Sequence, residues 1–229
     1  EPNVCVLEPF RFTPQELDLL LTPCGDRDEE IRFWNQFEHS DTFGSLIQPD
    51  SDVTARLGWH IAQLGDGGDM YKADVIERAK RVVSQADYLA QQYSVVIANP
   101  PYMGGKNMDA LLSAFAKEQF PDAKGDLFAM FIERNRRLVK RHGYIAMITM
   151  QSWMFLSSFV KLRMRIFEGH RLQSMAHLGA NAFDSIGGDV VSTTAFVLAV
   201  GSPSLSTYGT YLRLVERSEE RRVGKECLR

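Results

Sequence analysis

The 229-residue sequence is poor in cysteine, and Cys5, Cys24 and Cys227 have no paired spacing. Free thiols are therefore favoured over a disulfide framework or a thiolate metal site. The five histidines show no ligand spacing either, so no metal centre is expected. No apolar run approaches the roughly 20 residues of a membrane span, and no secretory leader follows Glu1. The sequence therefore predicts a cytoplasmic protein that does not enter a membrane.

An excess of positive charge is also absent, because the formal net charge is −3. A dedicated DNA-binding module usually gathers Lys and Arg on one surface, and this balance does not favour such a module. Basic residues do cluster within residues 134–141 and 161–171. We interpret both clusters as solvated faces of helices.

One apolar run, residues 95–98, lacks polar alternation. This is typical of a central strand in a parallel sheet whose two faces are covered by helices. The run ends at Asn99, Pro100, Pro101 and Tyr102. Because proline has no N–H group, pairing stops there and carbonyl oxygens are left pointing outward. Since ligands of open α/β sheets bind at the carboxyl edge, the sequence predicts a small polar pocket with an aromatic wall.

The predicted pocket suits an exocyclic amine. The Asn99 side-chain oxygen and the Pro100 carbonyl can each accept a hydrogen bond from the amine, while Tyr102 stacks on the attached ring. Gly104 and Gly105 let the chain turn away beside the pocket. The alternative is that the two prolines form a rigid exit turn without a chemical role.

The segment that follows reads as a capped helix and then a buried strand. Asp126 can cap a helix over residues 126–141, whose carboxyl end is favoured by the basic residues 140–142. Gly143 is expected to end this helix, and residues 144–149 form the next strand.

Residues 99–102 resemble the Asn/Asp-Pro-Pro-Tyr/Phe motif of amino-group DNA methyltransferases, and the Asn and Tyr variants favour adenine as the target. From about Pro2 to Glu216, the sequence most closely resembles the PglX-like adenine methyltransferases of bacteriophage-exclusion (BREX) systems. The phrases that carry this closer resemblance are residues 43–49, 99–105, 151–155 and 176–179.

The resemblance implies transfer of a methyl group from S-adenosylmethionine to a flipped adenine in DNA. It implies catalytic roles for Asn99, Pro100, Pro101 and Tyr102. Trp153 is then a candidate for the substrate pocket, although a core role suits this tryptophan equally. Sequence-specific DNA contacts and other phage-exclusion subunits are expected beyond this catalytic region.

The cofactor site is only partly expected within this chain. The Gly-rich turn that grips the cofactor in the resembled class is missing, and we interpret the glycines of residues 64–69 as a plain loop. If residues 3–7 form the third strand of the sheet, Glu8 takes the place of a polar cofactor contact.

The expected fold is α/β: a partial Rossmann-like methyltransferase sheet, mostly parallel with an antiparallel last strand and with helices on both faces. Residues 1–216 are expected to be an internal fragment of one catalytic domain, with a helical insertion at about 10–92 and the sheet half at 93–200, and 217–229 a non-native or disordered tail. The expected helices are one starting at Thr13 and those at 26–48, 70–92, 108–119, 126–141 and 156–168; the expected strands are 3–7, 93–98, 144–149, 172–178 and 190–200. The last two strands should form an antiparallel pair across residues 184–189.

Two other functions remain open from the sequence. One is a catalytically silent DNA-binding subunit of a defence system that keeps the pocket. The other is a methyltransferase that acts on RNA or on a protein glutamine, because Asn-Pro-Pro-Tyr also serves such groups. Trp34, Phe37 and Phe43 are interpreted as core residues, with a partner surface as the alternative.

Overall fold

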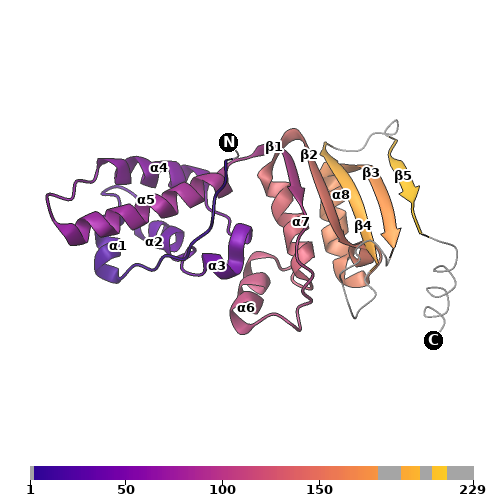
Figure 1. The fold of residues 1–229 in the computed structure, drawn as a ribbon, viewed down its shortest axis with the longest axis horizontal. Coiled ribbons are helices and arrows are strands. Elements are labelled where there is room, and N and C mark those ends of the chain that lie inside the picture. Colours follow the sequence, from indigo (N-terminus) through magenta and orange to yellow (C-terminus); the bar gives the residue numbers. More distant parts are fainter. Residues whose placement is uncertain (1–2, 180–191, 202–207, 216–229) are drawn as a thin grey trace. The chain divides into compact units, whose positions relative to one another are not determined.

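The computed structural model describes residues 3–179, 192–201 and 208–215, and it divides the chain into two compact units, residues 1–91 and 92–229 (Figure 1). The predicted tail 217–229 and the predicted connection 184–189 lie outside the described residues.

The first unit is helical in its described part. Its elements are α1 (Pro14–Leu20), α2 (Arg27–Asn35), α3 (Ser40–Phe43), the 3-10 helix η1 (Gly44–Leu46), α4 (Ser51–Gln63) and α5 (Met70–Ala90). The predicted capping box of α1 is confirmed: the Glu16 amide donates to Thr13 Oγ1 at 3.3 Å, and the Thr13 amide donates to Glu16 Oε2 at 2.7 Å. Residues 64–69 connect α4 and α5 as a loop, as predicted. Among the described residues, no helix is both long and apolar enough to cross a bilayer.

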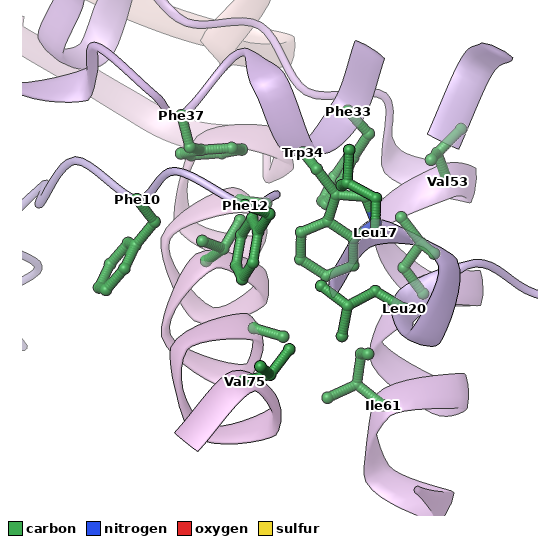
Figure 2. Close-up of a cluster of buried hydrophobic side chains, with 14 of the residues drawn as sticks. Phe10, Phe12, Leu17, Leu20, Phe33, Trp34, Phe37, Val53, Ile61 and Val75 are labelled. Atoms are coloured by element: carbon green, nitrogen blue, oxygen red, sulfur yellow. The ribbon is translucent and has the colours of Figure 1, made fainter. Parts of the chain in front are cut away.

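Aromatic side chains form the centre of the first unit (Figure 2). The Trp34 ring lies edge-on to Phe12 at 5.5 Å and to Phe33 at 5.2 Å between ring centroids. Trp34 and Phe37 have no exposed surface, and Phe43 packs on the same cluster. The interpretation of Trp34, Phe37 and Phe43 as core residues is therefore confirmed.

The predicted helix over residues 26–48 is wrong as a continuous element. The chain leaves helical geometry between Asn35 and Ser40, where the Phe37 carbonyl accepts the Phe10 amide at 3.1 Å. A contact with a distant part of the chain therefore breaks this helix. The helix α4 was not predicted, although Asp50 caps it and its buried face includes Val53, Leu57 and Ile61.

The predicted strand at residues 3–7 is also wrong, because no ladder forms there. This segment belongs to the helical unit, where Leu7 packs against the core cluster. Next to it, the Glu8 amide donates to Gln85 Oε1 of α5 at 3.0 Å. This side-chain oxygen is the acceptor in place of the backbone carbonyl that a neighbouring strand would offer.

The described part of the second unit contains a five-stranded sheet, three α-helices and two 3-10 helices. Its described elements are β1 (Tyr93–Ala98), α6 (Ala110–Gln119), α7 (Leu127–Leu138), β2 (Val139–Met150), the 3-10 helices η2 (Gln151–Met154) and η3 (Ser157–Phe159), α8 (Val160–Gly169), β3 (His170–Gly179), β4 (Thr193–Val200) and β5 (Thr210–Arg213).

The strand order is β1-β2-β4-β3-β5, with β1 parallel to β2 and β3 parallel to β5. The strand β4 is antiparallel to both β2 and β3, so it alone is reversed among the described strands. The mostly parallel sheet and the antiparallel pair of β3 and β4 are confirmed. The reversed strand β4 is followed by β5, a short strand that the sequence analysis did not predict.

The helices α7 and α8 lie side by side behind the sheet in Figure 1, held together by Arg165, whose guanidinium pairs with Glu133 at 3.2 Å. The sheet face beneath them includes Met147, whose sulfur accepts a hydrogen bond from Asn135 of α7 at 3.4 Å. Side chains alternate along β2, so that Ile145 and Met147 are buried whereas Ala146 and Ile148 are only partly covered. The two helices therefore cover one face of this sheet.

The helix predicted over residues 126–141 ends at Leu138, three residues early. Val139 pairs with Tyr93 and begins β2, because the tertiary pairing captures this β-branched residue. The helix is therefore not capped by Lys140, Arg141 and His142. These residues lie in a bulge, where residues 140–143 oppose Ser94 alone. His142 adopts a positive φ of 65° in this bulge.

Gly143 has a packing role in this bulge and does not terminate a helix. A Cβ atom at position 143 would lie 2.6 Å from the Ser94 carbonyl oxygen and 2.7 Å from Val139 Cγ2. Gly143→Ala is therefore expected to destabilise the unit by about 1–3 kcal/mol through overpacking, which would lower the thermal midpoint by several degrees. Gly169→Ala is the matched control, because an added Cβ there meets nothing within 4 Å. Equal midpoints for the two variants would contradict this role.

Candidate active site

The predicted catalytic residues follow the carboxyl end of β1. Asn99 is exposed, whereas Pro100 beside it is buried. All peptide bonds of the described residues are trans, including those that precede the two prolines. The structure therefore anchors the backbone at Pro100 and leaves the Asn99 carboxamide accessible, as the predicted pocket requires.

The Tyr102 ring belongs to a series of contacting aromatic side chains that continues into α7 and η3. Its ring lies edge-on to Phe128, with 6.3 Å between centroids and an interplanar angle of 88°, and Phe128 contacts Phe159 at 5.9 Å. The Tyr102 hydroxyl is buried without a hydrogen-bond partner among the described residues. Burial raises the pKa of this hydroxyl above its usual value. Tyr102 is therefore neutral at physiological pH and suited to stacking.

The two glycines predicted beside the pocket contact the segment that precedes α7. The Gly105 amide donates to the Gly125 carbonyl at 2.9 Å, and Gly104 pairs with Asp126 in an isolated antiparallel bridge. An added Cβ at position 105 would lie 3.4 Å from the Lys124 carbonyl oxygen. The glycines thus permit a close backbone approach, which agrees with a turn away from the strand end.

Gln151, Ser152 and Trp153 follow β2, whose carboxyl end shares an edge with that of β1 because the two strands are parallel. Trp153 itself is 1% exposed and packs against Phe196 at 5.2 Å between centroids. The Arg163 guanidinium donates to the Trp153 carbonyl at 2.7 Å. The Trp153 ring lies in the core of the second unit, and its role in a base pocket stays a prediction.

Glu8 belongs to the first unit. Its carboxylate forms an ion pair with Arg81 of α5, and its amide donates to Gln85. The argument for Glu8 as a cofactor contact rested on a strand at residues 3–7, and that strand does not form. The role of Glu8 therefore stays a prediction without its original support.

A cavity of about 450 Å³ opens on the sheet next to the end of β1. Asn99, Ser174 and Thr210 are the polar residues that line it, and the other lining residues are apolar. No carboxylate is among these lining residues.

Basic residues near this sheet are not simply solvated, and that interpretation is wrong for Arg134, which is 3% exposed. Burial lowers the pKa of Arg134 to about 10, with Arg137 adding a smaller repulsion. Arg165 pairs with Asp122 at 2.6 Å and with Glu133 at 3.2 Å. These contacts give the basic cluster a structural role. Within the described ranges, no group of His, Cys, Asp or Glu is arranged to hold a metal ion.

Asp126 was predicted only as the start of a helix, and Phe128 was not predicted to belong to the site. Asp126 contacts the loop that follows Tyr102, and Phe128 contacts the Tyr102 ring. No sequence signal predicts either contact, because both join segments more than 20 residues apart.

Comparison with known proteins identifies relatives of this chain. The chain is 44% identical over 187 residues to the adenine-specific methyltransferase BrxX of Escherichia coli O9:H4 (strain HS), covering 80% of this chain and 15% of that protein. It is 47% identical over 135 residues to the adenine-specific methyltransferase PglX of Lacticaseibacillus casei (strain Zhang), covering 58% of this chain and 11% of that protein. The chain therefore spans about one seventh or less of the length of these two relatives.

Among solved structures, a putative class I S-adenosylmethionine-dependent methyltransferase from Listeria monocytogenes matches with a TM-score of 0.40 and 12% identity, covering 87% of this chain and 78% of that one. The profile of the Eco57I restriction-modification methylase family matches residues 26–183, which is more than half of the chain and includes the Asn99–Tyr102 motif and α7. The chain belongs to the Eco57I restriction-modification methylase family.

Proposed function

We propose that this chain is part of a longer adenine-specific DNA methyltransferase that acts in phage defence or restriction-modification. Membership in a methylase family and the two relatives named adenine-specific methyltransferases support this proposal. The observation that carries it is the exposed Asn99 carboxamide beside the buried Pro100 at the carboxyl end of β1. This corner offers hydrogen-bond acceptors for an amine while its backbone stays fixed.

In the proposed reaction, the target adenine leaves the base stack at a cost of a few kcal/mol. Asn99 Oδ1 and the Pro100 carbonyl each accept one hydrogen of the exocyclic amine, and Tyr102 stacks on the purine. These two hydrogen bonds hold the nitrogen lone pair away from the ring and toward the methyl donor. No strong base is required, because the proton leaves after transfer, so the protein contributes mainly positioning and electrostatics.

S-adenosylmethionine supplies the methyl group in this proposal, as membership in a methylase family implies. The cavity beside Asn99 has no carboxylate in its lining, and we propose that the contacts to the methionine and ribose of the cofactor lie elsewhere in the longer protein. DNA is the proposed macromolecular substrate. Other subunits of a phage-exclusion system are proposed partners, on the basis of the BrxX and PglX relatives.

Transfer of tritium from labelled S-adenosylmethionine tests the proposal. The longer protein is incubated separately with duplex DNA, RNA and a protein mixture, and the labelled DNA is digested to nucleosides. Label is expected in N6-methyladenine from DNA. Label in RNA or in protein glutamine would instead identify one of the alternative substrates, and absence of label from all three would favour a silent DNA-binding subunit.

A further inference from the structure

The loop that carries Tyr102 is fastened to the first turn of α7. The Met103 amide donates to Asp126 Oδ1 at 3.2 Å, and the Leu127 amide donates to the Met103 carbonyl at 3.0 Å. Both polar groups of the Met103 backbone are therefore satisfied by residues at the start of α7. Since Met103 directly follows Tyr102, this attachment fixes the peptide group that joins these two residues.

The attachment continues for two more residues. Gly104 forms an antiparallel bridge with Asp126, and the Gly105 amide donates to the Gly125 carbonyl at 2.9 Å. The segment 103–105 thus runs antiparallel to residues 125–127. Among these contacts, the one from Met103 to Asp126 is made by a side chain, so it can be removed by a substitution without altering the backbone.

Asp126 performs two tasks with one oxygen atom. Its Oδ1 accepts the Phe128 amide at 3.3 Å and so caps α7, and the same atom accepts the Met103 amide. Phe128 is also the residue whose ring meets Tyr102. The carboxylate therefore connects the two aromatic residues of the candidate site through their backbones. Burial raises the pKa of Asp126, while the hydrogen bonds that its carboxylate accepts from backbone amides act to lower this pKa.

We propose that Asp126 is a positioning residue for methyl transfer, which holds the loop after Tyr102 so that the tyrosine ring faces the flipped base. This inference rests on the proposed function of Asn99–Tyr102, but it concerns a residue outside that motif. Asp126 acts through Met103 and contacts neither substrate nor cofactor. The catalytic effect comes from geometry, because displacement of a reacting group by about 1 Å can cost about 10²-fold in rate.

Helix capping alone is the competing explanation, and the choice of side chain separates the two. Serine is a good cap, but its oxygen is one bond closer to the backbone and cannot also reach the Met103 amide. Asparagine retains a carbonyl oxygen at the position of Oδ1 and can accept both amides. Asp126→Ser is therefore expected to keep the cap and lose the loop contact, whereas Asp126→Asn keeps both.

The experiment compares these two variants in the longer protein. Asp126→Ser is expected to lower kcat by about 10–100-fold with little change in KM for cofactor or in thermal midpoint, and Asp126→Asn should keep near-normal kcat. Asp109→Ser is the matched control, because Asp109 Oδ1 caps α6 through the Leu112 amide at 2.7 Å, and Asp109 forms no hydrogen bond to the Tyr102 loop among the described residues. This control should retain normal kcat.

Hydrogen exchange at the Met103 amide supplies a readout that needs no methylation. The amide should be protected in the wild-type protein and in Asp126→Asn, and it should exchange faster in Asp126→Ser. Normal kcat in Asp126→Ser would overturn the inference, and so would a slow, folded Asp126→Asn. If the wild-type protein methylates nothing while the exchange pattern is as expected, the proposed function fails and the attachment of the loop stands. Should Asp126→Ser not fold, Asp126→Asn still decides, because loss of its activity contradicts a role based on geometry.

Discussion

Replacing Asn99 with alanine in the longer protein is expected to lower kcat for adenine methylation by about 10²–10³-fold, the effect of removing one preorganised polar contact from an active site. Asn99 is exposed at the end of β1, so the substitution leaves no cavity in the core. Without its side-chain oxygen, one hydrogen of the amine loses its acceptor and the nitrogen lone pair is no longer held toward the methyl donor. Cofactor binding should be nearly unchanged, which equilibrium binding of S-adenosylmethionine measures beside the rate.

Two further variants make the result specific to the Asn99 oxygen. Asn99→Asp keeps an acceptor at the same place and should retain part of the activity. Asn107→Ala removes an exposed asparagine from the same connection between β1 and α6, where Asn107 contributes a backbone contact to Gly104, and it should leave the rate unchanged. Full activity in Asn99→Ala, or equal losses in Asn99→Ala and Asn107→Ala, would refute the role assigned to this side chain.

The sequence predicted best those elements whose signals are local. The apolar run of β1 and the β-branched content of β4 predicted strands, and both strands form. The capping box at Thr13 predicted the first residue of α1, because the side chains that satisfy the helix end are its immediate neighbours. For β4 and α1, the local preference and the tertiary structure agree. The central, covered position predicted for β1 is wrong within the described sheet, because β1 lies at its edge and Val95 and Ile97 are 53% and 78% exposed.

Predictions failed where a distant segment supplied the decisive contact. The basic residues after Leu138 suit a helix end, but pairing of Val139 with Tyr93 starts a strand first. Residues 3–7 have the composition of a strand, yet the packing of Leu7 on the helical core keeps them out of the sheet. Similarly, the Phe10 amide bonds to the Phe37 carbonyl where the predicted helix at 26–48 is interrupted. None of these partners is visible in the local sequence.

The candidate site shows the same division. Asn99, Pro100 and Tyr102 lie within four residues of the sequence, so their place at a strand end could be predicted, whereas their chemical roles stay predictions. The contact of Asp126 with Met103 joins residues 23 positions apart, and it depends on how α7 returns to the strand end. A helix cap is the local interpretation of Asp126, and that interpretation is correct, but it does not reveal the second amide that the same oxygen accepts.

Trp34→Ala is expected to destabilise the helical unit by about 3–5 kcal/mol, the cost of removing a large aromatic side chain from a packed core. Trp34 of α2 has no exposed surface. It lies at the centre of the group drawn in Figure 2, where side chains from α1, α4 and α5 also meet. Because four helices share this cluster, the cavity left by alanine would weaken the packing of all of them. Hydrogen exchange of the α5 amides measures the loss for this unit separately from the sheet.

Two matched variants distinguish packing from other effects of removing a tryptophan. Trp59→Ala should change stability by less than about 0.5 kcal/mol, as surface substitutions usually do, because Trp59 on α4 is 69% exposed. Trp34→Phe keeps most of the ring volume and should cost less than about 1.5 kcal/mol. It also removes the indole N–H, which is buried without a hydrogen-bond partner among the described residues, so the loss of that group offsets part of the cost. Similar losses in Trp34→Ala and Trp59→Ala would show that this aromatic cluster does not hold the helical unit together.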